Sequence, residues 1–190
     1  MSNSPLTIYA GQEARNRLRR EGWQADLFSL MVGASGGPKW FVLRYLDELV
    51  FTGFLAGGSK PMELIGSSIG SWRHLCLVQD DPLKALDVLA RRYCEQSYST
   101  RRPNAMEVSA VCTQMLNEIC AVNDGDIKTG LSRIIDHPRY HSHVVTARGG
   151  NFTGSPHSPV LLPSLGLAAL ANGLHRRALA PFFQIGRAHV

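Results

Sequence analysis

The sequence lacks several features that would place it in a specialised class of protein. Charged residues are only 18% and hydrophobic residues 44% of the 190 residues, which excludes a disordered, collagen-like or coiled-coil chain. No segment reaches the roughly 18 consecutive apolar residues needed to span a bilayer, and residues 1–20 hold no apolar signal-peptide core. We therefore expect one folded domain, in the cytoplasm or at a membrane surface facing it.

Metal-binding motifs are also lacking. The four cysteines, Cys76, Cys94, Cys112 and Cys120, show no C-x-x-C spacing and no neighbouring histidine cluster of zinc-finger type. Each lies in an expected helix among apolar residues, so we predict buried free thiols in a reducing compartment. No metal and no organic cofactor is expected.

The positive charge is not gathered into one block. The net charge of +5 comes from 20 Lys and Arg against 15 Asp and Glu, and the basic residues stand in short groups such as Arg176 and Arg177. This pattern is typical of solvated helix faces and predicts no nucleic-acid partner. An anionic lipid surface is the alternative partner that it leaves open.

Short apolar strands alternate with helices along the chain. Strands are expected at 27–32, 62–65 and 143–147. Helices are expected at 6–21, 38–56, 69–78, 82–94, 105–120, 127–135 and 161–183, the last broken near Pro163 and Pro181. Such alternation predicts a largely parallel sheet, whose ligands bind at the carboxyl ends of the strands.

Gly66-x-Ser68-x-Gly70 follows the second expected strand and opens a helix. This is the pattern of a nucleophile elbow, in which a tight turn exposes the serine hydroxyl above the sheet. The close approach of strand and helix leaves room only for glycine on either side. The alternative is a glycine-rich turn with an idle serine.

Gly36 and Gly37 follow the first expected strand, and Pro38 is suited to the first position of the next helix. Free N-H groups at such a helix start favour negative charge. We therefore predict that Gly36 and Gly37 form an oxyanion hole for an intermediate made by Ser68.

Two other interpretations of these motifs are weaker. A phosphate-binding P-loop would need a glycine at Pro38 and a hydroxyl at Trp40. An ordinary α/β-hydrolase would need more strands before its serine and a late histidine in a triad. The late histidines lie in no triad context, and we expect them at the surface or at helix ends: His137, His141, His143, His157 and His175.

Together these motifs resemble the patatin-like phospholipases, in particular a bacterial branch of that family, over most of the chain. The resemblance implies a three-layer α/β/α fold, a G-G-x-[KR] oxyanion loop and a Ser-Asp dyad without histidine. Lys39 would then support the loop, although Trp40 stands where a glycine often closes the motif.

The family's D-G-[GA] aspartate has no clear counterpart. Asp124-Gly125 is followed by Asp126 and lies in a polar loop, so we predict a turn there. The final segment, 185–190, matches the translation of a short-read sequencing adapter, and we expect it to be a non-native tail. The patatin-like domain would then occupy 1–184 as the N-terminal portion of a longer enzyme, with its aspartate beyond residue 184.

The sequence thus predicts a serine lipid acyl hydrolase acting on a lipid or other acyl ester, with contact to a membrane surface as a further expectation. The apolar stretch 161–183 is expected to accept an acyl chain or to pack in the core. The alternative function is a non-catalytic lipid-binding or scaffold protein, because a serine without its base loses most of its reactivity.

Overall fold

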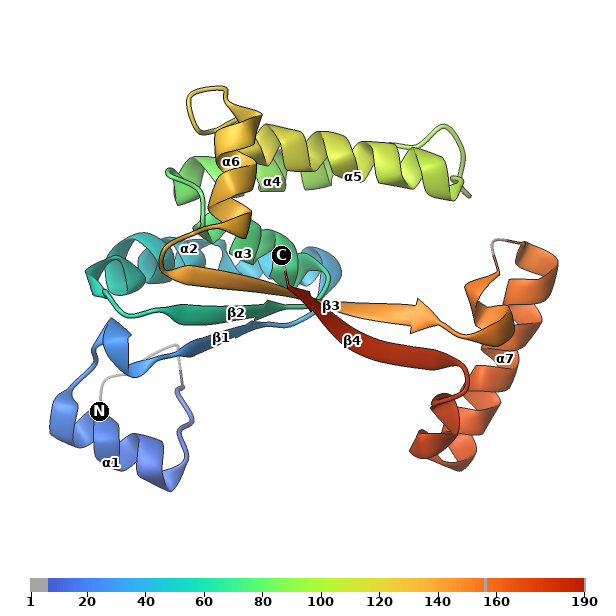
Figure 1. Ribbon diagram of the computed structural model, residues 1–190, viewed down its shortest axis with the longest axis horizontal. Helices are drawn as coiled ribbons and strands as arrows, with labels where there is room; N and C mark the ends of the chain where they lie inside the picture. The colour runs from blue at the N-terminus through green and yellow to red at the C-terminus, as the bar shows by residue number, and fades with distance from the viewer. Residues whose placement is uncertain (1–6, 156, 190) are drawn as a thin grey trace.

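A computed structural model describes residues 7–155 and 157–189 and shows a mixed α/β chain with a four-stranded sheet of order β1-β2-β3-β4 (Figure 1). The strands are β1 (Leu30–Gly33), β2 (Met62–Gly66), β3 (Tyr140–Gly149) and β4 (Phe183–His189). β1, β2 and β3 are parallel, whereas β4 is antiparallel to β3. The expected largely parallel sheet is confirmed.

The helices that begin at a clear capping residue lie close to their expected positions. Asp81 accepts a hydrogen bond from the Lys84 amide at 3.0 Å and caps α4, while Asn104 and Asp126 cap α5 and α6 in the same way. The α-helices are α1 (Gln12–Glu21), α2 (Arg44–Glu48), α3 (Ile69–Leu77), α4 (Pro82–Glu95), α5 (Ala105–Cys120), α6 (Ile127–Ile135) and α7 (Ser158–Leu174).

The segment expected as one helix at 38–56 is irregular. A 3-10 helix, η2 (Gly37–Leu43), leads into α2, and a π-helical stretch, η3 (Leu49–Phe54), and a short 3-10 turn, η4 (Leu55–Gly57), follow. Tight winding is common at helix starts, and Gly53 within the π-helical stretch has a low helix propensity. The first strand is also shorter than expected, because Ala25–Leu27 form a 3-10 turn, η1.

The helices cover mainly one face of the sheet. α3 contacts β1, β2 and β3, and α4, α5 and α6 stack above it (Figure 1). Leu64 of β2 belongs to the same buried core as Leu86 and Leu89 of α4 and Ile119 of α5. On β1, by contrast, Leu30 and Val32 are 48% and 67% exposed. The described residues therefore form two layers, and the expected third layer is not among them.

β3 and β4 leave the sheet as a two-stranded ribbon that carries α7 away from the rest of the molecule (Figure 1). α7 runs through Pro163, so the expected break there is wrong. Beside the proline, the Ser164 hydroxyl donates to the Val160 carbonyl at 2.7 Å, a bond that often accompanies bending of a helix. After α7 the chain forms a 3-10 turn, η6 (Arg176–Leu179), and then β4, which pairs with β3 up to His189 and so includes most of the expected tail.

Candidate active site at the end of the parallel strands

Ser68 lies at the sharp turn between β2 and α3. Its φ of 53° and ψ of −125° are unusual for a residue with a side chain, and among the described non-glycine residues only Asp124 shares a positive φ. The Ser68 side chain is exposed, whereas Ile69 beside it is buried. A strained backbone that presents a hydroxyl to solvent is the local geometry of a nucleophile elbow.

Glycine is required on both sides of this turn because backbone atoms approach closely. A Cβ on Gly70 would lie 2.2 Å from the carbonyl oxygen of Gly33, and a Cβ on Gly66 would lie 2.5 Å from the Cα of Ser71. Neither neighbour is a flexible side chain that could move aside. The prediction that the close approach of strand and helix leaves room only for glycine is therefore confirmed at both positions.

The glycine loop leaves the sheet beside the Ser68 turn. Gly33 of β1 and Gly66 of β2 are paired in register, and the Ser67 amide donates to the Gly33 carbonyl at 2.9 Å. Adjacent strands lie about 4.8 Å apart, so residues 34–37 and 67–70 leave neighbouring strands at the same level of the sheet (Figure 1). The two motifs singled out from the sequence are brought together.

The loop itself has the form of a helix start. Gly37 has a φ of 52°, which a residue with a side chain would adopt only with strain, and Pro38 follows at the first turn of η2. The N-H groups of Gly36 and Gly37 precede the helical hydrogen bonds and have no acceptor within the helix. Lys39 is exposed, and the buried Trp40 stacks on Phe41 with 4.6 Å between ring centroids.

A buried ion pair fixes the helix after Ser68 against the helix after the glycine loop. Arg73 of α3 donates from Nε to Asp47 Oδ2 of α2 at 2.6 Å and makes a second contact through Nη2 to Oδ1. Their side chains are only 14% and 3% exposed. Because α2 continues directly from η2, this pair holds the two halves of the candidate site in a fixed relation.

His74, which the sequence analysis did not single out, packs beneath the site. It is 3% exposed, and its Cε1 atom lies 2.9 Å from where a Cβ of Gly33 would be. Burial, and secondarily the Arg73 charge, lower the pKa of His74 to about 4, so its imidazole is neutral near pH 7. His74 lies four residues after Gly70 on the same helical face, and this spacing is the sequence signal that it packs near the site.

Asp124 lies at the far end of α3 from Ser68. Its neighbour Asn123 donates to Gln79 Oε1 at 2.6 Å and accepts from the Asp80 amide at 2.9 Å, just beyond the last turn of α3. Asp124 and Gly125 have φ values of 53° and 81°, which confirms the predicted turn. The structure therefore does not bring Asp124 to the serine.

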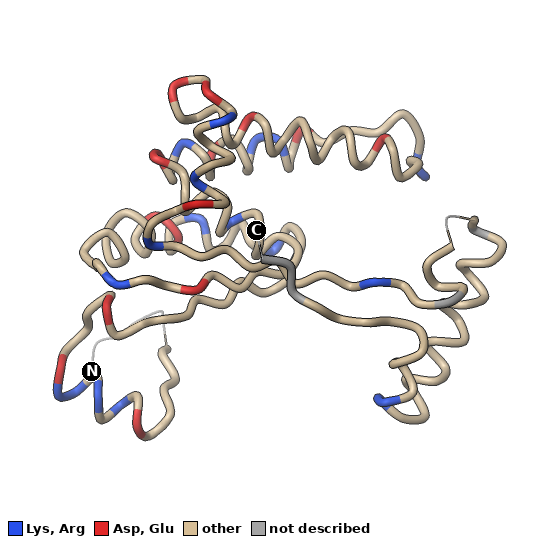
Figure 2. Tube along the Cα trace, in the orientation of Figure 1, with Lys and Arg blue, Asp and Glu red and all other residues tan. Residues whose placement is uncertain are grey.

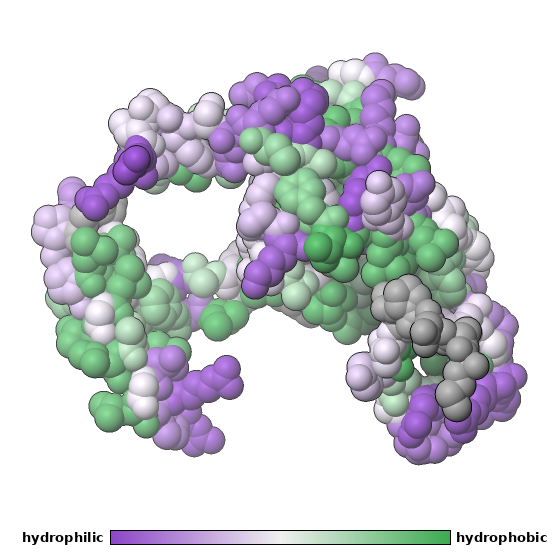
Figure 3. Space-filling view, turned by 180° about the vertical axis from the view of Figure 1, so that it is seen from behind, coloured by the Kyte–Doolittle hydropathy of each residue, from purple (hydrophilic) through white to green (hydrophobic). Residues whose placement is uncertain are grey.

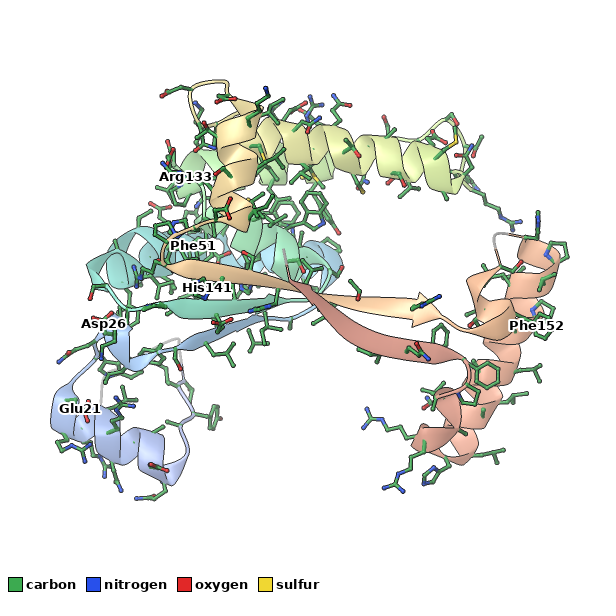
Figure 4. All side chains as sticks on the ribbon, in the orientation of Figure 1. Glu21, Asp26, Phe51, Arg133, His141 and Phe152 are labelled. Atoms are coloured by element: carbon green, nitrogen blue, oxygen red, sulfur yellow. The ribbon has the colours of Figure 1, made fainter. Side chains whose placement is uncertain are left out.

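A second polar cluster joins β2 to β3. The Glu63 carboxylate contacts the rings of both His141, at 3.0 Å, and His143. His141 lies in the first part of β3 (Figure 4). Hydrogen bonds from His143 and His141 lower the pKa of Glu63. His143 is 2% exposed, so its expected surface position is wrong. Its place on the central strand β3, with β2 and β4 on either side, accounts for the burial.

The cysteines differ in burial. Cys76 and Cys120 are buried as expected, but Cys94 is exposed and Cys112 is only partly buried, so that prediction is wrong for Cys94. Cys94 lies in the last turn of α4, beyond the stretch that faces the core. Burial raises the pKa of the Cys76 thiol and that of Cys120, the latter to about 11. Within the described ranges, no group of three or more His, Cys, Asp or Glu side chains could hold a metal ion.

The site thus consists of an exposed serine on a strained turn, beside a glycine loop at a helix start. We compared the chain with family models, curated proteins and solved structures, and none of them matches it.

Proposed function

We propose that this chain carries the nucleophile and oxyanion hole of a serine acyl hydrolase of patatin-like type. The observation that carries the proposal is the backbone of Ser68, held at φ 53° between two glycines that tolerate no side chain. The three-layer α/β/α arrangement is part of this proposal, and the described residues supply two of its layers.

In the proposed reaction the Ser68 hydroxyl attacks the carbonyl carbon of an acyl ester. The C-O double bond opens to a tetrahedral oxyanion, which the N-H groups of Gly36 and Gly37 stabilise. The alcohol leaves with a proton, and the acyl group remains on Ser68 until water releases it. Each positioned donor of this kind contributes roughly 3 to 4 kcal/mol to the lowering of the barrier.

The proton acceptor would be the aspartate of a Ser-Asp dyad, as the resemblance implies. We do not assign it to Asp124, because that residue lies at the opposite end of α3. His74 lies closer in sequence, but burial lowers its pKa to about 4, which makes its imidazole a poor proton acceptor.

Labelling with a fluorophosphonate probe tests the proposal directly. The wild-type chain should react, and Ser68→Ala should not. Ser67→Ala is the matched control, because Ser67 is the adjacent serine of the same turn and should leave the reaction unchanged. Equal labelling of all three proteins, or no labelling of the wild type, would remove the enzyme interpretation for this chain.

The second candidate function is non-catalytic lipid binding. It is favoured by the apolar surface of α7, where Leu162, Leu170 and Leu174 are 65%, 69% and 88% exposed. In that case Ser68 would be inert to the probe while lipid vesicles would still bind.

A further inference from the structure

The helix α7 exposes an unusual amount of apolar surface. Val160, Leu167, Leu170 and Leu174 follow one another at intervals of seven, three and four residues and so share one face. Leu167 and Leu170 are 59% and 69% exposed, and the space-filling view shows hydrophobic side chains along this helix (Figure 3). Exposing so much apolar surface to water is unfavourable, and surfaces of this kind mark sites of interaction with a partner or a membrane.

The buried side of α7 is narrow by comparison. Ser164 and Ala168 are its described buried side chains, and the helix contacts η5 (Asn151–Gly154) and η6 rather than the helical layer over the sheet. The core of the molecule is complete without α7, since the core cluster contains no residue of this helix. Its apolar face is therefore available to an outside surface.

The charge around α7 has one sign. Residues 137–190 contain five arginines and no aspartate or glutamate, and the remaining 15 basic and 15 acidic residues balance one another. Arg148 on β3 and Arg176 and Arg177 at the end of α7 are exposed, and the ribbon and helix carry blue but no red positions (Figure 2). Arg139 donates to the Leu55 and Lys60 carbonyls beside the sheet, so four of these five arginines belong to the segment 140–190 that carries the apolar face.

We propose that α7 and η6 form a docking surface for an anionic lipid bilayer. The exposed leucines of α7 would enter the interface, while Arg148, Arg176 and Arg177 contact lipid phosphates. Among the described helices none is both long and apolar enough to cross a bilayer. A second copy of the chain is the weaker occupant, because two such regions would repel each other. This surface goes beyond the proposed reaction and does not depend on Ser68.

Vesicle co-sedimentation of the full chain tests the charge requirement. The protein should pellet with vesicles of phosphatidylcholine and phosphatidylglycerol in about a 2:1 ratio, and raised salt should release it. Arg176→Glu with Arg177→Glu should weaken this partition at least about 30-fold, because each basic residue near the surface contributes roughly fivefold. Lys84→Glu with Lys128→Glu, two exposed lysines of the helical layer, makes the same change in charge and should bind like the wild type.

A second pair of variants tests the apolar face. Leu167→Ser with Leu170→Ser should weaken partition at least about tenfold, whereas Val42→Ser with Ile135→Ser removes side chains that are 82% and 58% exposed and should have little effect. In a Leu170→Trp variant the tryptophan fluorescence emission should shift to shorter wavelength when the protein binds the anionic vesicles. This readout remains usable if a serine variant folds poorly.

Three outcomes would overturn the docking surface. The protein could pellet equally with pure phosphatidylcholine vesicles, the arginine and leucine variants could bind like the wild type, or the protein could be a dimer that dissociates in the leucine variants and does not bind vesicles. Ser68→Ala should pellet like the wild type. Loss of probe labelling and loss of membrane binding are therefore separate results.

Discussion

Gly70 is the residue at which α3 meets the end of β1. We expect Gly70→Ala to lower the free energy of unfolding by about 3 kcal/mol or more, because the new methyl group would meet the backbone of Gly33 rather than a movable side chain. Urea denaturation measures this. Gly166→Ala in α7, where a Cβ meets nothing within 4 Å, should change stability by no more than about 1 kcal/mol, and in the stabilising direction. Equal stability of both variants would refute the close contact.

His74 makes stability depend on pH in a defined direction. Its pKa in the folded protein is about 4, below the ordinary 6.5, so the unfolded chain binds a proton at higher pH than the folded chain does. Stability is therefore fully present above about pH 6.5 and falls as the pH drops toward about 4. Between about pH 7 and pH 5 the expected loss from this group is about 2 kcal/mol.

Urea denaturation of the wild type and His74→Gln at the two pH values measures this loss. Between these pH values the free energy of unfolding of His74→Gln should decrease by about 2 kcal/mol less than that of the wild type. Burial lowers the pKa of His137 as well, but that contribution is present in both proteins and cancels. The Glu63 pKa is lowered from 4.5, so its stabilising effect is lost only below this window. A parallel decrease in both proteins would show that His74 is not buried as neutral imidazole.

At the scale of elements, the Arg73–Asp47 pair joins α3 to α2. Asp47→Asn should destabilise the protein by about 3 to 5 kcal/mol, because it leaves the Arg73 charge buried without its partner. Asp87→Asn is the matched control: Asp87 also pairs with an arginine, Arg44, but is 68% exposed and should cost less than about 1 kcal/mol. Similar losses in the two variants, measured by thermal or urea denaturation, would contradict a special role for the buried pair.

The elements predicted well are those with local signals. Asp81, Asn104 and Asp126 cap helices through their own side chains, and a short segment is enough to specify each start. β4 was missed because its pairing with β3 is a contact between distant segments, and its residues were expected to be helix or tail. The irregular winding of 37–57 likewise has no local marker beyond Pro38 and Gly53.

The residues of the candidate site also fall into those with a local sequence signal and those that depend on distant contacts. Ser68 with Gly66 and Gly70 could be predicted, because one turn contains the whole geometry. The pair between Asp47 and Arg73 joins residues 26 positions apart, and no spacing rule connects them. His74 was overlooked because its only signal is its place four residues after Gly70, on the helical face that packs against β1.

At the scale of the whole molecule, the structure has two parts with different chemistry. The sheet and its helical layer hold the core and nearly balanced charges, whereas the β3–β4 ribbon and α7 hold exposed leucines and uncompensated arginines (Figures 2 and 3). The candidate site lies at the strand ends of the first part, and the docking surface lies on the second. The same β3 strand runs through both parts and connects them covalently.

The parallel pairing of β2 with β3 also bears on the order of folding. Glu63 and His141 are neighbours in the sheet but stand 78 positions apart in the chain. Helices α3 to α6 form from local contacts, whereas this strand pair requires the closure of a long loop, which is entropically costly and slow. During synthesis, the Ser68 turn would therefore emerge long before β3 completes the sheet beside it, and β2 would present an open edge in the interval.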